Sequence, residues 1–578
     1  MPGIIFTVIS NFFAVYPAKI VGYSLDLIVE TLTVYRATSG FSFQKDYYAF
    51  TLQSVAILAG LYLALALVKG IFMFFMRQTL VVMSRHIEYD LKNDIYAHYQ
   101  KLDQAFFKRN NTGDLMTRIS EDVSKVRMYV GPALMYAVNL VVMFVLVING
   151  MVAVSPLLTL YVLLPMPVMA VMIYYINRQV LLQSSLAQKQ LSSLSSLSQE
   201  VFSGVRVIKS YNRSHFFSQL FSRQSDLYKD SSLRLIKYDA LFFPVILFLI
   251  GLSTLITVYA GGREVMAGRL NPGVIGEFII YVNLLTWPVA SVGWVSSMVQ
   301  QAAASQERIN EFLYTPPGIK NPPSPQKPEI KGRVVFDDVT FTYPDTGITA
   351  LKNIRFETLP GQIIGITGRT GSGKSTIAAL LGRLYDVESG GIYIDGVDIA
   401  HMDLSHLRRS IGYVPQEIIL FSDSISENIS FGTHKHTTAE DWENAARQAG
   451  VWQNIMDFRE KFDTRIGERG VKLSGGQKQR ISIARALINN PPILVFDDCL
   501  SAVDAETEEN ILMHIMDVSK GKTTFLISHK VSTLKKCDNI LVLDSGRLVE
   551  SGKHEALLAS GGYYARIARL QSEPEEEI

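Results

Sequence analysis

Long apolar stretches fill the first half of the chain and end near residue 300. Six of them are almost free of charge and long enough for a helix to cross a bilayer, which takes about 20 residues. They cover residues 3–25, 49–76, 129–152, 157–177, 241–262 and 274–298. One such stretch would fit a buried helix of a soluble protein. Six predict an all-α domain of six membrane-spanning helices over residues 1–314.

The connections between these stretches are unequal in length and charge. Those after the second and fourth stretches, residues 77–128 and 178–240, are long and rich in Lys and Arg. The third and fourth stretches are separated by little more than Ser155 and Pro156. Because basic connections stay on the cytosolic side, we expect both long connections and both chain ends in the cytosol. The first stretch lacks a basic segment before it, so we expect no cleaved signal peptide.

A different pattern follows the proline-rich stretch 315–328, TPPGIKNPPSPQKP. This stretch cannot continue a helix or join a sheet, so it is a predicted linker. Residues 329–572 have the pattern of a soluble α/β domain, and the acidic residues 573–578 are a predicted solvated tail. The mean hydropathy of +0.19 therefore averages two unlike halves.

The sequence GRTGSGKS at residues 368–375 matches the phosphate-binding pattern G-x-x-x-x-G-K-[ST] and follows an apolar, β-branched run. Its glycines allow backbone N–H groups to surround phosphates, its lysine reaches the β- and γ-phosphates, and its serine binds Mg²⁺. The pattern predicts ATP and Mg²⁺ as cofactors. The predicted ATP-binding residues here are Gly368, Arg369, Thr370, Gly371, Ser372, Gly373, Lys374, Ser375 and Thr376. A glycine-rich turn before a helix remains the alternative until other motifs are considered.

The sequence LSGGQ at residues 473–477 is the signature of ATP-binding cassette (ABC) proteins. With the phosphate loop and the six apolar stretches, the whole chain resembles an ABC exporter of the bacterial multidrug half-transporter type. The resemblance implies a six-helix transmembrane domain followed by an α/β P-loop ATPase domain, working as a dimer in the cytoplasmic membrane. In such dimers the signature caps the ATP held by the partner; its residues here are Leu473, Ser474, Gly475, Gly476 and Gln477.

The resemblance assigns further residues of the ATP site. Tyr343 matches the aromatic residue that stacks on adenine, and Gln416 matches the glutamine that senses Mg²⁺ and the attacking water. Asp497 ends a predicted strand and would hold Mg²⁺ together with Ser375 and Gln416. His529 matches the histidine at the γ-phosphate. The implied catalytic residues are Asp498, His529 and Gln416, and those of the loop that crosses the dimer interface are Ser501 and Asp504.

Asp498 departs from the family pattern, in which a glutamate follows the first aspartate and acts as general base. Aspartate is one methylene shorter, and misplacement by about 1 Å can cost on the order of 100-fold in rate. We therefore favour a heterodimer in which this chain contributes the degenerate ATP site and an intact signature. A homodimer that uses Asp498 as a slow base, or a mainly regulatory ATP-binding subunit, remains the alternative.

The resemblance extends to the segments that would couple the two domains. Residues 106–114 and 200–217 look like the two cytosolic coupling regions, and residues 464–470, TRIGERG, like the exporter loop that meets them. Importers lack this loop, so we expect outward transport. Aromatic residues crowd the apolar stretches and favour a hydrophobic or amphipathic small-molecule substrate of the multidrug type. Lipid or peptide export is the alternative.

The remaining composition excludes some functions. A net charge of +2 gives no sign of nucleic-acid binding, and six apolar stretches argue against a soluble ABC ATPase that acts on DNA or ribosomes. The only cysteines, Cys499 and Cys537, lie in the predicted cytosolic domain, so we expect no disulfide. No cluster of Cys and His residues suggests a structural metal.

Overall fold

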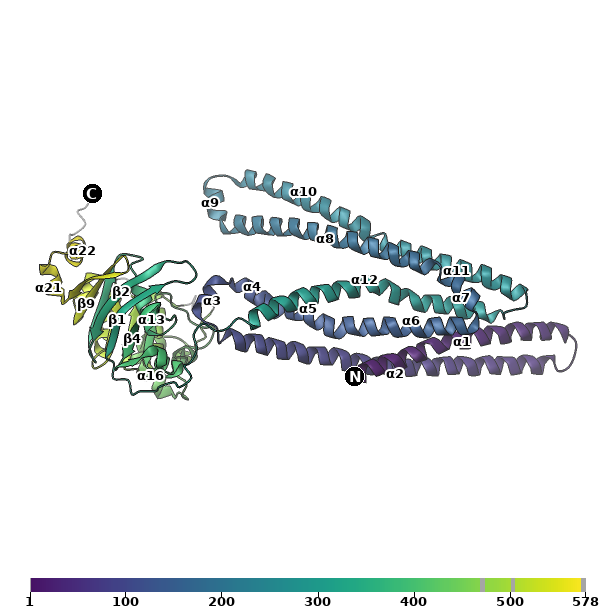
Figure 1. Cartoon of the computed structure of the whole chain (residues 1–578), viewed down its shortest axis with the longest axis horizontal. Helices are drawn as coiled ribbons and strands as arrows, with labels where there is room; N and C mark the ends of the chain where they lie inside the picture. Colours follow the sequence, from purple (N-terminus) through teal and green to yellow (C-terminus); the bar gives the residue numbers. More distant parts are fainter. Residues whose placement is uncertain (1, 468–472, 501–504, 573–578) are drawn as a thin grey trace. The chain divides into compact units, whose positions relative to one another are not determined.

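The computed structural model describes residues 2–467, 473–500 and 505–572. It divides the chain into two compact units (Figure 1). The first, the membrane unit, comprises Met1–His98 and Leu115–Thr315. The second, the ATPase unit, comprises Tyr99–Asp114 and Pro316–Ile578. Part of the connection between the second and third spans therefore packs with the C-terminal half of the chain.

The membrane unit contains the six predicted spans. Within the described residues, six helical segments are long and apolar enough to cross a membrane. Their bounds are Pro2–Ala37, Gln44–Tyr99, Thr112–Val154, Pro156–Ser203, Ser214–Met266 and Gly273–Leu313. The segments run well beyond the predicted apolar stretches, because the polar residues that flank each stretch continue the same helix.

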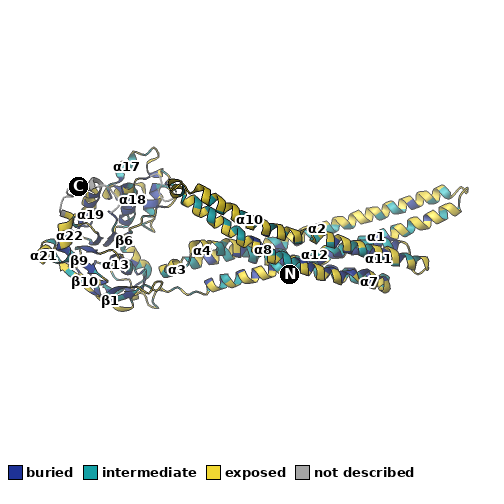
Figure 2. Ribbon diagram, turned by 90° about the horizontal axis from the view of Figure 1, so that it is seen from above, coloured by how far each residue is buried: buried dark blue, intermediate teal, exposed yellow. Residues whose placement is uncertain are grey.

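Several of these segments are interrupted by short breaks. Two π-helical turns lie within the third segment, and the second of them contains Pro132, which lacks the N–H that an α-helix would use. The fourth and fifth spans continue into an antiparallel pair, α8 and α10, that lie side by side in Figures 1 and 2. The helices are α1 (Pro2–Ala37), α2 (Gln44–Tyr99), α4 (Thr112–Thr117), η1 (Arg118–Asp122), α5 (Val123–Met128), η2 (Tyr129–Ala133), α6 (Leu134–Val154), α7 (Pro156–Leu163), α8 (Pro165–Ser203), α9 (Val205–Ser210), α10 (Ser214–Asp239), α11 (Phe242–Met266) and α12 (Gly273–Leu313).

Small and polar residues contribute to the contacts between helices in this unit, beside an apolar cluster that includes Phe278, Tyr281 and Leu285. The buried face of α1 includes Thr7, Ser10 and Asn11. A Cβ atom on Gly273 of α12 would lie 2.0 Å from the carbonyl oxygen of Gly22 in α1, so only glycine permits this approach. Small residues allow membrane helices to come this close, and interhelical hydrogen bonds add to the packing.

The ATPase unit is built on two sheets. The strands of the smaller sheet are antiparallel, in the order β2-β1-β4-β5. The larger sheet has the order β10-β9-β3-β8-β7-β6, and all of its neighbouring strands are parallel except β10 and β9. The strands are β1 (Val334–Thr342), β2 (Thr349–Thr358), β3 (Ile363–Gly368), β4 (Ser389–Ile394), β5 (Val397–Asp398), β6 (Ile411–Val414), β7 (Ile493–Asp497), β8 (Thr523–Ile527), β9 (Asn539–Asp544) and β10 (Arg547–Gly552).

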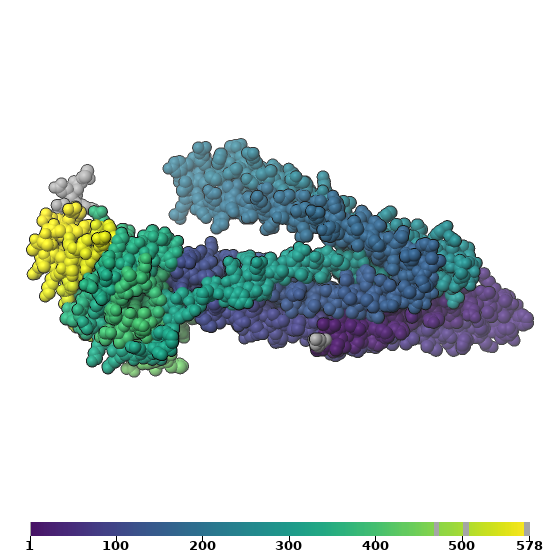
Figure 3. Space-filling view, viewed as in Figure 1, coloured from purple at the N-terminus to yellow at the C-terminus, as the bar shows by residue number. Residues whose placement is uncertain are grey.

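Helices flank these strands, and the last two lie in the yellow C-terminal region at one end of the unit (Figure 3). The helices are α3 (Gln104–Arg109), α13 (Lys374–Leu381), η3 (Ile399–His401), α14 (Leu404–Arg409), α15 (Ile425–Ser430), α16 (Ala439–Gln448), α17 (Trp452–Met456), η4 (Lys461–Asp463), α18 (Gly475–Leu487), α19 (Ala505–Val518), α20 (Val531–Leu534), α21 (His554–Ala559) and α22 (Tyr563–Ser572).

The central parallel strands place the candidate site. β7 and β8 are buried along their whole length, as strands covered on both faces must be. β3 pairs with β8, and β8 pairs with β7. Because the carboxyl ends of neighbouring parallel strands lie at one edge of a sheet, Gly368, Asp497 and Ile527 come together at that edge.

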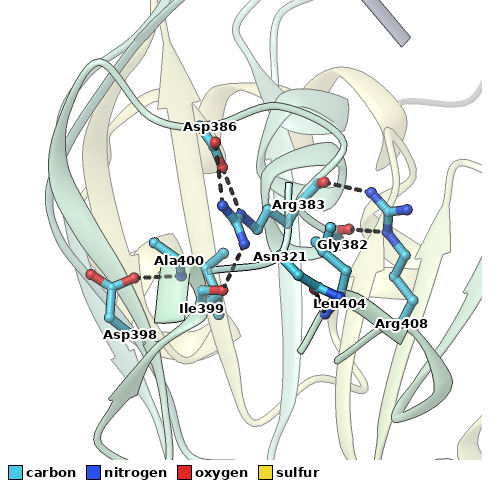
Figure 4. Close-up of polar contacts among 9 residues, drawn as sticks. All are labelled: Asn321, Gly382, Arg383, Asp386, Asp398, Ile399, Ala400, Leu404 and Arg408. Carbon is cyan, nitrogen blue, oxygen red and sulfur yellow. Dashed lines mark hydrogen bonds and ion pairs between the residues drawn. The ribbon is translucent and has the colours of Figure 1, made fainter. Parts of the chain in front are cut away.

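The proline-rich stretch forms no helix but packs on the ATPase unit. Gln326 makes one isolated β-bridge with Met402, and the Asn321 side chain accepts a hydrogen bond of 2.8 Å from the Leu404 N–H. Near this contact, Arg408 donates to the carbonyl oxygens of Gly382 and Arg383 (Figure 4). These contacts fix the linker along part of its length.

The short helix α3 is tied into the ATPase unit at both ends. Asp103 caps it by accepting from the Phe106 N–H, and its other carboxylate oxygen accepts from the Gly318 N–H at 2.9 Å. At the C-terminal end, Arg109 donates a 3.0 Å hydrogen bond to the carbonyl oxygen of Pro344. This helix lies within residues 106–114 and the residues just before them, which the sequence predicts as the first coupling region.

Candidate ATP site

The loop between β3 and α13 has the backbone conformation of a phosphate-binding nest. Gly368, Gly371 and Gly373 have φ angles of 144°, 80° and 101°, which favour glycine. A Cβ atom would lie 2.0 Å from the Leu543 carbonyl oxygen at Gly368, and 2.5 Å from the Ala350 carbonyl oxygen at Gly373. The loop is therefore possible only with glycine at these two positions, and it precedes the N-terminus of a helix, where anions bind.

Lys374 lies inside this loop. Its side chain is buried, and its Nζ donates hydrogen bonds to the carbonyl oxygens of Gly368 at 3.0 Å and Arg369 at 2.8 Å. Burial lowers the pKa of Lys374, while the nearby carboxylates of Asp498 and Asp497 act in the opposite direction. The Ser372 hydroxyl is also buried and has no hydrogen-bond partner among the described groups. A loop with a buried ammonium and an unsatisfied hydroxyl fits a phosphate group.

Asp497 and Ser375 stand together at the end of β7. The Ser375 Oγ donates a 2.9 Å hydrogen bond to Asp497 Oδ1, and the Tyr413 hydroxyl donates a 3.4 Å bond to Oδ2. Burial raises the pKa of Asp497, although the bonds from Ser375 and Tyr413 oppose this shift. A carboxylate beside a hydroxyl supplies the hard oxygen ligands that Mg²⁺ prefers, so these residues fit a Mg²⁺ ion next to the phosphate loop.

Asp498 has a strained backbone and sits among the other predicted catalytic residues. Its φ angle is 42°, in the left-handed region that few residues other than glycine adopt, and its N–H donates to the Ile527 carbonyl oxygen. Gln416 Nε2 donates a 3.4 Å hydrogen bond to Asp498 Oδ2. Burial raises the pKa of Asp498, whereas the charges of His529 and Lys374 lower it. For His529, burial and the charge of Lys374 lower the pKa.

Tyr343 follows β1 and is held from two sides. Its hydroxyl lies 3.0 Å from the Thr376 Oγ1, and its ring meets the Tyr385 ring edge-on. The Nζ of Lys108, from α3, lies 4.5 Å from the centroid of the Tyr343 ring. Such cation–π contacts contribute about 0.5–1 kcal/mol at exposed sites. The sequence gives no signal for this contact of Lys108 beyond its place in a basic connection.

The signature residues form the beginning of α18. Ser474 caps the helix by accepting from the Gln477 N–H, and Gln477 Oε1 accepts from the Ser474 N–H at 3.0 Å. Ser474 and Gly475 are exposed, whereas Leu473 and Gly476 are buried. The helix N-terminus is thus presented at the surface, where it can meet an anion. Ser501 and Asp504, as well as residues 468–470 of the predicted exporter loop, lie outside the described residues.

The site therefore unites most of the predicted residues. The phosphate loop, Asp497, Asp498, Gln416 and His529 surround one sheet edge. The signature lies at the N-terminus of α18. Tyr413 was not foreseen, because its contact with Asp497 depends on the pairing of β6 with β7.

Comparisons with known proteins cover both units of the chain. The family model described as "ABC transporter transmembrane region" matches residues 2–289, and the one described as "ABC transporter" matches residues 351–501. The multidrug resistance-like ATP-binding protein MdlA of Escherichia coli is 36% identical over 508 residues, covering 88% of this chain and 86% of that protein. An ATP-dependent lipid A-core flippase of Pseudomonas fluorescens is 34% identical over 500 residues, covering 86% and 83%. The structure of a bacterial Atm1-family ABC exporter with ATP bound superposes with a TM-score of 0.78 at 27% identity, covering 99% of each chain.

Proposed function

Because the chain belongs to the ABC transporter family and carries a membrane domain and an ATPase domain in one polypeptide, we propose that it is the degenerate-site subunit of a heterodimeric exporter of hydrophobic or amphipathic small molecules. The family and the exporter fold make it a multi-pass membrane protein with a cytosolic ATPase domain that acts as one half of a dimer. The heterodimer, the unequal sites and the substrate class are the proposal.

The observation that carries the proposal is the position and length of Asp498. Burial raises the pKa of this carboxyl, and a carboxylate with a raised pKa is a stronger proton acceptor while it remains ionised. Electrostatics therefore does not prevent Asp498 from acting as a base. The rate of hydrolysis depends instead on how close its carboxylate comes to the attacking water. Its hydrogen bond from Gln416 and its fixed backbone leave a side chain one methylene short of the glutamate usual in the family. The expected rate loss is on the order of 100-fold.

The roles of the other residues follow from their contacts. Lys374 exchanges its bonds with two loop carbonyls for the β- and γ-phosphates, and Tyr343 stacks on adenine. Ser375, Asp497 and Gln416 would hold Mg²⁺, and the ion would supply positive charge to the phosphate oxygens. His529 contacts the γ-phosphate. Ser474 and the N-terminus of α18 complete the ATP site of the partner, so this chain supports fast hydrolysis at a site whose base it does not supply.

The substrate class rests on the relatives and the aromatic membrane helices. One relative is named for multidrug resistance, and another for flipping lipid A-core, an amphipathic lipid. Both fit a cavity that accepts an apolar body with a polar end. Lipid export is the second candidate, favoured by the flippase relative.

The test begins with the native complex. The tagged chain is purified from its own membrane, and the associated half-transporter is identified by mass spectrometry. A partner with glutamate at the position of Asp498 is the expected result. ATP hydrolysis is then compared between the wild-type complex and the Asp498→Asn variant. A site about 100-fold slower supplies about 1% of turnover, so this variant should leave the total rate nearly unchanged.

A second variant tests the other half of the proposal. Ser474→Ala should reduce turnover severely, because Ser474 would act at the site that hydrolyses ATP quickly. Since Ser474 also caps α18, the matched control is Thr438→Ala, which removes a similar cap from α16 away from the ATP site. Loss of all turnover in Asp498→Asn, in a complex containing only this chain, would establish a homodimer that uses aspartate as its base.

A further inference from the structure

We propose that a cavity between α8 and α12 of the membrane unit binds anionic amphipathic molecules, with Arg178 pairing to the anionic group. This inference rests on the proposed export function, and it names the substrate class that the function leaves open. It combines the shape of the cavity, the charge at one of its walls and the contrast with a neighbouring cavity.

The cavity has an apolar wall and a polar end. Its volume is about 350 Å³, enough for a small aromatic molecule with a short chain. Ile173 and Val289 are buried beneath it, and Leu181 and Val292 extend the apolar wall. Asn177, Arg178 and Gln300 supply the polar groups. A ligand with an apolar body and a single polar end matches this distribution.

Arg178 is the only charged residue that lines this cavity among the described residues. The described part of the chain offers its guanidinium no hydrogen bond or ion pair. An arginine side chain remains protonated in proteins and presents donors that match a carboxylate, sulfonate or phosphate in a two-point contact. Charged side chains within membrane-spanning segments pair with one another or mark a substrate pathway. Since no carboxylate of the described residues lines the cavity, the ligand is the partner that fits.

A second explanation is that Arg178 only anchors the end of the span at the lipid headgroups. The position of Arg178 favours a role in ligand binding instead, because Arg178 lines the same cavity as residues of α12 such as Gly293. A Cβ atom on Gly293 would lie 1.8 Å from the Asn177 amide nitrogen. Glycine therefore lets α8 lie directly against α12 at Asn177, which is next to Arg178 in sequence.

The neighbouring cavity shows that the charge is a specific property of this one. It has a volume of about 390 Å³, lies on the side of α12 that faces α5, and shares Ser297 with the first cavity. Glu121 and Lys125 both line it, so its charges are balanced. Of these two cavities, only the one that contains Arg178 is expected to discriminate between anions and cations.

The experiment uses the purified exporter complex in lipid nanodiscs and three probes with the same dansyl body. Dansyl-β-alanine is an anion, dansylamide is neutral and dansylcadaverine is a cation. Binding is followed by dansyl fluorescence, with empty nanodiscs subtracted, and by stimulation of ATP hydrolysis. The wild type should bind the anion most tightly. Arg178→Gln should weaken anion binding about 10- to 100-fold, as expected for a lost charge-assisted contact, and leave the neutral probe unchanged.

Matched variants separate the charge from the fold and from the cavity shape. Arg178→Lys should retain most of the anion preference, and Arg178→Glu should shift the preference to the cation. Lys189→Gln removes a charge from the same helix outside the cavity and should change nothing. Gly293→Ala should weaken all three probes together, because its Cβ pushes the Asn177 amide into the cavity.

Three results would overturn the proposal. These are equal binding of the three probes by the wild type, unchanged anion preference in Arg178→Gln, or an equal loss in Lys189→Gln. ATP hydrolysis without any probe serves as the check on folding. If a variant at Arg178 hydrolyses no ATP, Arg178→Lys is used in its place. If wild-type hydrolysis persists while anion preference is absent, only the proposed ligand class fails. If the wild-type complex hydrolyses no ATP, the proposed export function itself fails.

Discussion

The two units of this protein both have apolar cores, but they differ in the other side chains that they bury and expose. The ATPase unit buries large apolar residues, such as the stacked rings of Phe336 and Phe356, whose centroids lie 4.6 Å apart. The membrane unit buries threonine, serine and asparagine on α1 and exposes leucine and phenylalanine along α2. Figure 2 shows dark blue gathered in the sheets and yellow along the membrane helices.

The difference follows from the solvent that each unit faces. In water, removing apolar surface from the solvent is the main force that holds a core together. Lipid is as apolar as leucine, so large apolar side chains gain little by leaving it, and helix contacts depend on close packing and hydrogen bonds. A large apolar side chain is therefore predicted to contribute unequally to the free energy of unfolding of the two units.

The largest expected effect separates a buried phenylalanine of the ATPase unit from an exposed phenylalanine of the membrane unit. Phe336→Ala should lower the free energy of unfolding of the ATPase unit by about 3–5 kcal/mol, since Phe336 is 0% exposed and its removal leaves a cavity. Phe74→Ala should change the stability of the membrane unit by less than about 0.5 kcal/mol, since Phe74 is 62% exposed. Chemical denaturation of the full chain in nanodiscs measures both.

Tryptophan fluorescence reports each unit separately in that experiment. Trp442 and Trp452 belong to the ATPase unit, and Trp287 and Trp294 to the membrane unit. Replacing one pair by phenylalanine leaves a probe of the other unit. Equal destabilisation by the two alanine variants would show that the units do not differ in the way proposed.

A smaller effect is expected where the ATPase unit buries a polar group. Lys374→Ala should weaken ATP binding at this chain's own site about 10- to 100-fold, because a hydrogen bond to a charged group is worth about 1.5–3 kcal/mol. Binding of a labelled, non-hydrolysable ATP analogue by the full chain measures the loss. Lys522→Ala, a partly buried lysine at the other end of β8, is the matched control and should bind normally. Unchanged binding by Lys374→Ala would remove the phosphate loop assignment.

The smallest effect is expected for a polar contact between membrane helices. The Ser253 Oγ of α11 donates a 3.2 Å hydrogen bond to the Val162 carbonyl oxygen of α7. Ser253→Ala should lower the stability of the membrane unit by about 0.6 kcal/mol, the average for such bonds in lipid. The matched control is Ser54→Ala, whose hydroxyl bonds within its own helix at an exposed position. Equal midpoints of thermal unfolding for both variants would contradict the role of the interhelical bond.

Sequence patterns predict where the candidate ATP site lies better than they predict how the membrane helices pack together. The phosphate loop and Asp497 depend on short motifs that follow buried strands, and the parallel order of β3, β8 and β7 brings them together. The contact of Lys108 with Tyr343 depends on packing between residues 235 positions apart in number, and no local pattern encodes it. The six spans were predictable because apolar length is a local property.

The rotation of each membrane helix was not predictable in the same way. The aromatic residues of the apolar stretches favour a substrate cavity, and Trp294 lines a cavity of the membrane unit. The cavity beside Arg178 depends instead on Gly293, whose missing side chain admits the Asn177 amide. Close packing of small and polar residues sets helix rotation, and a hydropathy pattern does not record it.

The packing of α3 with the ATPase unit has a consequence for how the chain is interlocked. The polypeptide passes between the two units at three points, after His98, after Asp114 and after Thr315. A protease cut within the linker therefore does not release the C-terminal fragment. The N-terminal fragment still carries α3, which packs on the ATPase unit. The hydrogen bond from Arg109 to Pro344 and the contact of Lys108 with the Tyr343 ring hold α3 in place. The two fragments separate only when the contacts of α3 break. These contacts lie next to the aromatic ring on which adenine is proposed to stack.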